Sequence, residues 1–582
     1  MNRRRFLKAG LVAGASMLLP WQRVMQVLAQ GVLDPLTQPK FVNPLPVLAN
    51  IGGRFDVTGG GTHEVRITQF SQQLGLVDPV TGTPLSTTVW GYQFPGQAQG
   101  TYPGFTFVAR RDVPVDVRWV NALEDAVTGD PLPHLLPVDT SIHWANPAGW
   151  PGIGVPVVTH LHGGHSESAS DGLPEAWFTP QFVVRGAQWV KETFHYDNDQ
   201  EAGTLWYHDH ALGITRLNVY AGLAGFYLLR DANEDALIAA NAIPSGPYEI
   251  EIVIQDRMFT TDGQLFYPST VAIPGAPTPS VLPEFFGNII LVNGLAWPFL
   301  NVEPRKYRFR LLNGSDSRFY NLLLSSGQPF LQIGTDNGFL NAPVPVNQLT
   351  IGPGERADVV VDFAPFTGQT IVMRNNAKIP FPMGATVNPR TTGQIMAFNV
   401  GNTPVADPVT LPANLRPVTG PFPPAELANP VRTRQLILFE GVDEFGRLQP
   451  LLGTVAGGTR LWADPITENP SVGDVEVWEI YNTTPDAHPI HLHLVTFQIL
   501  NRQRFRATVG PTGALTGIRL LGQPKPAEAN ELGPKDTAQM FPGEVTRIVA
   551  KFDRSGRYMW HCHILSHEDH EMMRPYYVGP VA

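Results

Sequence analysis

The chain has 582 residues, which is too many for one hydrophobic core, because single cores stop growing at about 250 to 300 residues. It is 43% hydrophobic and 16% charged, with 56 glycines and 55 prolines, which argues against a disordered or transmembrane chain and is typical of an all-β protein. The formal net charge of -10 argues against nucleic acid or an anionic membrane as the main partner and favours a small neutral or cationic ligand.

The first 29 residues have the features of an export signal. Residues 2–8 carry three arginines and a lysine, residues 9–20 are apolar, and small residues surround Ala29. The paired arginines before Phe-Leu-Lys resemble a twin-arginine signal, which directs a folded protein across a membrane. A membrane anchor is the alternative, but the apolar run is shorter than the roughly 20 residues that a span needs. We therefore expect residues 1–29 to be removed from a periplasmic or extracellular protein that has no stable membrane insertion.

The remaining chain alternates short apolar runs with clusters of Gly, Pro and Asn. We predict sandwich strands at 113–120, 249–255, 307–312, 357–363 and 435–440. Proline and small polar residues accumulate near 241–247 and 404–430, so we expect domains of ordinary size at 30–243, 244–405 and 406–582. The proline-rich segment 263–283 is predicted to be a long surface loop.

Ten of the 16 histidines lie in four tight groups, in which two imidazoles of a His-x-His strand point to the same face and can reach adjacent metal ions. One such pair could be two exposed or separately hydrogen-bonded histidines, but four together predict metal binding. The groups are His160 and His162; His208 and His210; His488, His491 and His493; and His561, His563 and His567. We expect structural roles for His63, His134, His143, His165 and His195, and an exposed or supporting position for His570.

The single cysteine, Cys562, lies in the last group. It cannot form an internal disulfide, and a free thiol in an oxidising compartment is best explained by a metal bond. A thiolate, two imidazoles and a weak thioether make a blue copper site for single electrons, a donor set that favours copper over zinc. Cys562, His567 and Met572 can supply three of these ligands, and His488 is the candidate for the fourth. Met573 is the alternative to Met572, which the spacing along the loop favours.

The residues beside the cysteine indicate a second metal centre. Strand alternation directs Cys562 to one face and both His561 and His563 to the other. Once His488 and His567 are assigned to the blue copper, eight of the ten clustered histidines remain. Eight imidazoles suit three copper ions with two, three and three ligands.

Four motifs follow one another along the chain: His-Leu-His-Gly from 160, Trp-Tyr-His-Asp-His from 206, His-Pro-Ile-His-Leu-His from 488 and His-Cys-His from 561. With these motifs the sequence resembles the multicopper oxidases. Residues 160–177, 215–223 and 352–363 resemble the branch of bacterial spore-coat laccases and bilirubin oxidases. The resemblance extends over residues 44–578.

The resemblance implies an all-β fold of three cupredoxin-like, Greek-key β-sandwich domains with four copper ions, one type 1, one type 2 and two type 3. The middle domain supplies no ligand and is expected to hold the outer two in register. The implied ligands are His488, Cys562, His567 and Met572 for type 1, His160 and His491 for type 2, and His162, His208, His210, His493, His561 and His563 for type 3.

The implied activity is that of a laccase-like enzyme, which oxidises phenols, aryl amines or bilirubin-like donors one electron at a time and reduces dioxygen to water. We expect donors to deliver electrons through an exposed edge of His488, and Glu568 and Asp171 to supply protons and orient water at the cluster. The partners are then a small reducing substrate and dioxygen, and the protein is expected to be a monomer.

Two alternatives remain open at this point. The first is a metallo-oxidase of cuprous, ferrous or manganous ions, which is weakened by the presence of only 11 methionines and no Met-rich insert. The second is a non-enzymatic cupredoxin-like scaffold that has lost its metals, against which the complete ligand set argues.

Overall fold

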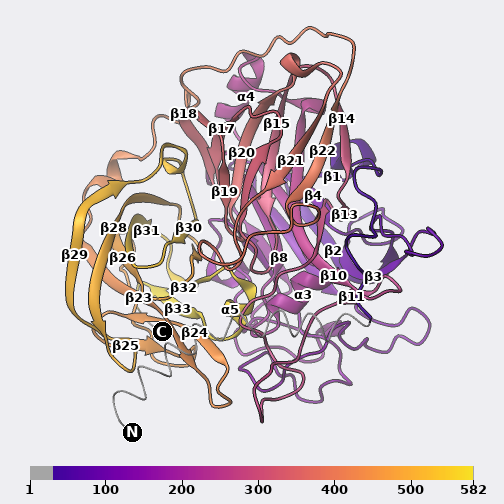
Figure 1. The fold of residues 1–582 in the computed structure, drawn as a ribbon. Helices are drawn as coiled ribbons and strands as arrows, with labels where there is room; N and C mark the ends of the chain where they lie inside the picture. The colour runs from indigo at the N-terminus through magenta and orange to yellow at the C-terminus, as the bar shows by residue number, and fades with distance from the viewer. Residues whose placement is uncertain (1–30, 581–582) are drawn as a thin grey trace.

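The computed structural model describes residues 31–580, and its strands form six sheets that fall into three groups along the chain (Figure 1). The signal peptide expected at residues 1–29 lies outside the described residues. The prediction of an all-β chain is confirmed, and strands occupy all five predicted positions. Within residues 31–580, no helix combines the length and the apolar character that crossing a membrane requires.

The first group of sheets packs around a core rich in aromatic side chains, including Phe107, Trp119 and Tyr207. One sheet has the order β1-β4-β9-β8-β6 and the other β3-β2-β5-β7. Their bounds are β1 (Arg54–Asp56), β4 (Gly104–Arg110), β9 (Ala224–Arg230), β8 (Gly203–Asp209) and β6 (Thr159–His162), and β3 (Thr87–Gln93), β2 (Gly61–Gln72), β5 (Val115–Asn121) and β7 (Thr193–Tyr196).

The second group forms the upper part of Figure 1 and buries a core of its own. The larger sheet contains β13 (Leu295–Ala296), β12 (Ile289–Val292), β10 (Glu249–Phe259), β15 (Lys306–Asn313), β20 (Arg356–Asp362), β17 (Phe330–Thr335) and β18 (Gly338–Val346) in this order, with β11 (Leu265–Phe266) beside β10. The smaller contains β14 (Phe299–Val302), β22 (Gln394–Val400), β21 (Thr370–Asn375), β16 (Tyr320–Leu324) and β19 (Leu349–Ile351).

The third group, orange to yellow in Figure 1, contains Cys562 in its core. Its larger sheet has the order β25 (Gly458–Arg460), β24 (Leu448–Thr454), β23 (Arg432–Val442), β26 (Asp474–Asn482), β31 (Glu544–Phe552), β28 (Phe497–Val509) and β29 (Leu515–Pro526). The smaller has the order β30 (Thr537–Met540), β27 (His488–Leu492), β32 (Gly556–Cys562) and β33 (Met573–Val578).

One pairing recurs in all three groups. β2 pairs with β5, β10 with β15 and β23 with β26, each time in parallel, whereas most other neighbours are antiparallel. Parallel neighbours need a connection that leaves the sheet and returns to it. Because each group uses strands from one stretch of sequence, we retain boundaries near residues 243 and 405 as a proposal.

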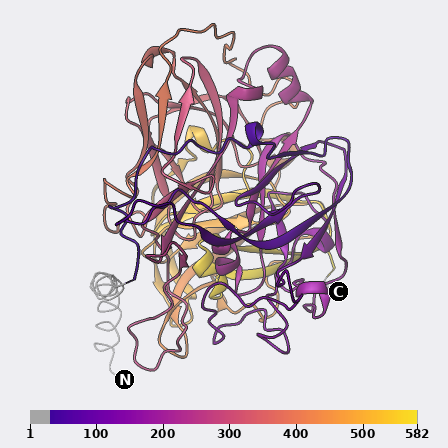
Figure 2. The ribbon, with the colours of Figure 1, turned by 90° about the vertical axis from the view of Figure 1, so that its right-hand side faces the viewer.

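Short helices lie between the strands. Within residues 31–580, the α-helices are α3 (Thr215–Ala221), α4 (Ala232–Ala239) and α5 (Leu565–Asp569), and the 3-10 helices are η1 (Leu48–Ile51), η2 (Ser168–Ser170), η3 (Pro180–Phe182), η4 (Gly246–Tyr248), η5 (Ala364–Phe366), η6 (Ala425–Ala428) and η7 (Ala529–Glu531). The Asp569 carboxylate at the end of α5 accepts hydrogen bonds at 3.0 Å from the backbone N–H groups of Thr215 and Arg216, at the start of α3. These bonds fix the third group against the first. Figure 2 shows yellow strands of the third group behind the indigo strands of the first.

Segment 263–283 is largely a surface loop, as predicted, but its two ends are buried. Tyr267 donates its hydroxyl to Asp316 at 2.8 Å, and the backbone N–H of Val281 donates to Asp139 at 2.7 Å. The loop is therefore anchored at both ends, which its proline-rich composition did not indicate.

Candidate metal centres

Four strands from the first and third groups carry most of the clustered histidines. β6 and β8 pair with His160 opposite His208, and β27 and β32 pair with His491 opposite His561. All ten histidines are at most 1% exposed. Because an unpartnered buried polar group costs free energy, so many imidazoles away from water need a common partner.

The first cluster joins the cysteine to two histidines. The Cys562 sulfur lies 3.5 Å from His488 Nδ1 and 3.7 Å from His567 Nδ1, and these two nitrogens are 3.2 Å apart. Ligand atoms placed about 2.0–2.3 Å from one ion at the corners of a triangle lie about 3.5 Å apart, so the three atoms fit a single trigonal metal. Burial raises the pKa of the Cys562 thiol well above its usual range, and a bound cation would keep it deprotonated.

The two methionines after this cluster lie in different cores. Met572 is fully buried in the same core as Cys562 and Ile564, and its carbonyl accepts the backbone N–H of Cys562 at 3.0 Å. Met573 belongs to the core of the first group and pairs with His561 across β33 and β32. Met572 is thus the methionine on the sulfur side of β32.

The other eight histidines meet between the first and third groups, on the opposite face of β32. Their nitrogens form three sets whose potential ligand atoms lie within 4.8 Å of one another. The sets are His160, His162 and His491; His162, His208 and His563; and His210, His493 and His561.

The hydrogen bonds of these histidines show where their lone pairs point. His160 and His208 donate from Nδ1 to backbone carbonyls, and the Nε2 atom of each, facing inward, has no partner. His493 donates from Nδ1 to the Asp171 carboxylate at 2.7 Å. The Nδ1 atom of His561 lies 3.1 Å from the backbone carbonyl oxygen of the next residue, Cys562. The Nε2 atoms of His493 and His561, 3.2 Å apart, therefore both present lone pairs, which repel unless a cation lies between them. The donor set fits metal ions.

The two predicted acidic residues contact this histidine cluster. Glu568 is fully buried, with one carboxylate oxygen 3.2 Å from His561 Nδ1 and the other 3.7 Å from His210 Nε2, and neither oxygen has a hydrogen-bond partner. Asp171 accepts from His493, and burial raises its pKa well above the usual range. Although Glu568 directly follows His567 in the sequence, its side chain lies on the side of the eight histidines.

The prediction that an edge of His488 is exposed is wrong. His488 is fully buried, and its Nε2 donates to the Thr484 hydroxyl at 2.7 Å and lies 3.8 Å from Glu440. The Glu440 side chain is 12% exposed, so His488 lies one side chain beneath the surface.

Three acidic residues near His488 had no signal in the motifs: Glu284, Glu440 and Asp486. Burial together with the charge of Asp486 raises the pKa of Glu440 to about 8, and burial raises the pKa of Asp486 to about 6. Burial, and after it the charges of Asp486 and Glu440, raise the pKa of Glu284 well above its usual range. They come from loops and strands far apart in sequence, which only the fold brings together.

The remaining histidines lie outside the two clusters. His570 is 3% exposed, and its Nε2 lies 3.3 Å from Asp443. Of the two positions predicted for His570, the exposed one is therefore wrong. His165 bridges Asp199 of the first group and Asp553 of the third, at 2.8 and 3.1 Å. His63, His134 and His195 contact residues of the first group, and His143 lies 3.4 Å from Glu571 of the third. None of the four belongs to a candidate metal group among residues 31–580.

Known proteins resemble this chain over most of its length. Family models described as multicopper oxidase match residues 153–234 and 451–582. A laccase of Bacillus stratosphericus is 45% identical over 495 residues, 84% of this chain and 90% of that protein, and a laccase of Bacillus subtilis is 41% identical over 93% of this chain and 98% of its own. The chain belongs to the multicopper oxidase family. The crystal structure of McoA multicopper oxidase from Aquifex aeolicus matches with a TM-score of 0.68 and 25% identity, covering 93% of this chain and all of that one.

Membership in the multicopper oxidase family settles the fold and the class of reaction. The fold consists of three cupredoxin-like domains, as predicted. The protein is a laccase-like, copper-binding oxidoreductase that takes electrons from a small reducing substrate and uses dioxygen as the acceptor. The predicted alternative, a scaffold without metals, is excluded.

Proposed function

We propose that this enzyme oxidises phenols, aryl amines or bilirubin-like donors one electron at a time and couples four such steps to the reduction of dioxygen to water. The observation that carries the proposal is the pair of donor sets on opposite faces of β32, one with sulfur and two imidazoles, the other with eight imidazoles. Copper, when bound, supplies one-electron redox chemistry at the sulfur set and multi-electron chemistry at the imidazole set.

The proposed stoichiometry is four copper ions. His488, Cys562, His567 and Met572 would hold a type 1 ion, because their donor atoms are those of a blue site and lie in one core. For the imidazole set, the three groups of nitrogens support a type 2 ion on His160 and His491 and a type 3 pair on the other six. The type 3 ligands would be His162, His208 and His563 for one ion, and His210, His493 and His561 for the other.

The backbone between the two sites provides the route for electrons. Cys562 is bonded directly to both His561 and His563, so an electron that reaches its sulfur has a covalent path of a few bonds to either imidazole. Donors would transfer electrons from the surface near Glu440, because His488 is covered by that side chain and by Thr484.

Protons for water formation need a separate route. Glu568, whose oxygens lie beside His561 and His210 without other partners, is placed to hold and deliver a proton at the histidine cluster. Asp171 fixes the ring of His493 and accepts its Nδ1 hydrogen.

The carboxyl groups near His488 favour a second candidate, the oxidation of a reduced metal ion. A cation bound near Glu284, Glu440 and Asp486 would relieve the charge repulsion that, with burial, raises the pKa values of Glu284 and Glu440, and oxygen ligands suit hard cations. The sequence similarity to laccases favours organic donors instead.

Oxygen uptake with a panel of donors separates the two candidates. We expect a phenol or an aryl amine to be oxidised with four donor electrons consumed per dioxygen and no peroxide released. Uptake only with ferrous, cuprous or manganous ions would select the metallo-oxidase, and peroxide as the product would contradict the four-electron chemistry.

We further propose that residues 1–29 export the folded enzyme through a twin-arginine route to the periplasm or medium, and that it acts as a monomer. The basic and apolar segments of the N-terminus support the first proposal. Size-exclusion chromatography of the secreted enzyme and N-terminal sequencing test both.

A further inference from the structure

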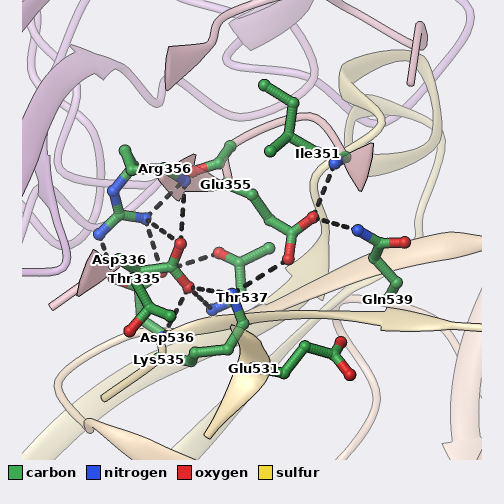
Figure 3. A network of polar contacts seen from close by, with 12 residues as sticks. Thr335, Asp336, Ile351, Glu355, Arg356, Glu531, Lys535, Asp536, Thr537 and Gln539 are labelled. Atoms are coloured by element: carbon green, nitrogen blue, oxygen red, sulfur yellow. Dashed lines mark hydrogen bonds and ion pairs between the residues drawn. The ribbon is translucent and has the colours of Figure 1, made fainter. Parts of the chain in front are cut away.

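A buried ion pair connects the middle domain to the histidine cluster. Arg356, the first residue of β20, faces Asp536, which directly precedes β30 of the third domain (Figure 3). The guanidinium donates to both carboxylate oxygens, with Nη1 2.8 Å from Oδ1, and neither side chain is more than 1% exposed. Arg356 Nε also donates to the carbonyl of Thr204 on β8 at 2.8 Å. One side chain of the middle domain thus contacts both outer domains.

Asp536 contacts two histidines of the cluster through different atoms. Its Oδ1 lies 3.0 Å from His162 Nε2, and its backbone carbonyl lies 2.9 Å from His491 Nδ1. The two imidazoles stack with ring centroids 3.7 Å apart and planes at 13°. His162 comes from the first domain and His491 from the third, so Asp536 joins rings across the domain interface.

His162 has the opposite orientation to its neighbours. The nitrogen without a partner is Nε2 in His160, His208 and His491, but Nδ1 in His162. His210 Nδ1 also has no partner, but the Nε2 of that ring lies 3.3 Å from His561 Nε2 within the cluster, whereas His162 Nε2 faces Asp536. A neutral imidazole carries one hydrogen, so an inward lone pair on Nδ1 requires the hydrogen on Nε2 and an acceptor for it. Asp536 Oδ1, at 3.0 Å, is the nearer and the charged acceptor for that hydrogen. The Thr537 hydroxyl, which donates to Asp536 Oδ1 at 2.8 Å, lies 3.2 Å from the same ring nitrogen and can accept only a longer bond.

We infer that Asp536 and Arg356 are positioning residues for the oxygen-reducing cluster. Asp536 fixes the tautomer and ring orientation of His162, and Arg356 fixes the plane of the Asp536 carboxylate by binding both of its oxygens. Partners of this kind behind a ligating histidine set its tautomer, and their loss lowers metal affinity or activity about 10- to 100-fold. The inference rests on the proposed assignment of His162 and His491 as copper ligands, and it gives the middle domain a part in the site without supplying a ligand.

The direct test is the imidazole N–H signal of His162 in the copper-free, full-length protein labelled with 15N-histidine. A hydrogen bond to a carboxylate shifts this proton downfield and protects it from exchange. We expect Asp536→Ala to abolish the downfield signal while the His491 signal persists, because the backbone carbonyl remains. Asp536→Asn should retain it, since the amide oxygen can still accept.

A matched control is Asp358→Ala, which removes a buried carboxylate paired with Arg308 and Arg310 but in hydrogen-bonding contact with no histidine. We expect the control to leave the His162 signal and the copper affinity of the cluster unchanged, Asp536→Ala to weaken copper binding about 10- to 100-fold, and Asp536→Asn to lie between. Arg356→Lys, which cannot bind both oxygens in the same plane, should fall close to Asp536→Asn.

The inference is overturned if Asp536→Ala keeps the His162 signal, or if its copper affinity equals that of Asp358→Ala. Should Asp536→Ala not fold, Asp536→Asn decides: a His162 signal at the wild-type shift together with the copper affinity of Asp358→Ala overturns the positioning role. The proposed function fails in a different way, through wild-type protein that binds fewer than four copper ions or does not reduce dioxygen.

Discussion

The two faces of β32 hold sites that depend on the fold in different ways. On the Cys562 face, His488, His567 and Met572 all come from the third domain and lie in its core. On the other face, eight histidines from the first and third domains meet, and Arg356 of the middle domain supports them through Asp536. The proposed electron-entry site therefore needs one folded domain, whereas the proposed oxygen site needs two domains docked in register. Variants should affect the two sites separately.

Cys562→Ser gives the largest expected effect. The intense visible absorption of a blue copper arises from thiolate-to-copper charge transfer, and no other cysteine exists to replace this one. We expect the colour and the turnover to vanish, as measured by visible absorption and oxygen uptake. Retention of the blue colour would show that the sulfur face is not the type 1 site.

Glu568→Gln tests the other face. The amide keeps the size of the side chain and its contacts with His561 and His210 but removes the exchangeable acid, so a loss of about 100- to 10,000-fold in turnover is expected. In stopped flow without oxygen, the donor should reduce the blue copper at the wild-type rate, and reoxidation by dioxygen should be slow. Slow reduction with normal reoxidation would instead assign Glu568 to the donor side.

Met572→Leu should change a potential rather than abolish activity. Removing a weak axial donor disfavours oxidised copper, so the reduction potential of the blue site should rise while its colour remains. Redox titration of the visible band measures it. The matched control is Met573→Leu, whose side chain lies in the core of the first domain and should leave the potential unchanged. A shift in the control alone would transfer the axial role to Met573.

His165→Gln concerns the docking of the first and third domains and has the smallest expected effect. Burial lowers the pKa of His165, but hydrogen bonds to Asp199 and Asp553 outweigh it and raise the pKa to about 9. A raised histidine pKa stabilises the folded state fully below pH 6.5, and the stabilisation is lost as pH rises through 9. Because the ring is partly exposed, we expect a loss of about 2 kcal/mol at pH 6 and none above pH 10.

Thermal unfolding of wild type and His165→Gln across this pH range measures the difference. His195→Gln is the control, because His195 pairs with Asp116 and Asp197 inside the first domain and should not affect docking. A destabilisation of His165→Gln that is independent of pH would contradict the charge-based account.

Much of this arrangement could be predicted from the sequence because the chemistry is local. His-x-His on a strand and His-Cys-His determine which side chains share a face, and alternation alone separates Cys562 from His561 and His563. The strand at 357–363 was predicted from its apolar run, and Arg356 just before it lies in the segment 352–363 that resembles the laccase branch. Nothing in that segment revealed the contact of Arg356 with Asp536, 180 residues away.

The features that the sequence did not reveal depend on packing between distant segments. The burial of His488 results from Thr484 and Glu440, and Glu284 reaches the same region from the end of a proline-rich loop. Hydrogen-bond partners such as Asp536 for His162 have no fixed spacing from the ligands they support. Local patterns therefore predicted the candidate ligands, and only the fold revealed what covers and orients them.

Copper content per chain, measured in wild type and in Cys562→Ser, tests the central claim that β32 separates a one-copper site from a three-copper site. The account predicts four copper ions in the wild-type protein and three in the variant, with the type 2 signal in electron paramagnetic resonance retained. Loss of copper from both sites in Cys562→Ser, or a wild-type content below four after full loading, would contradict it.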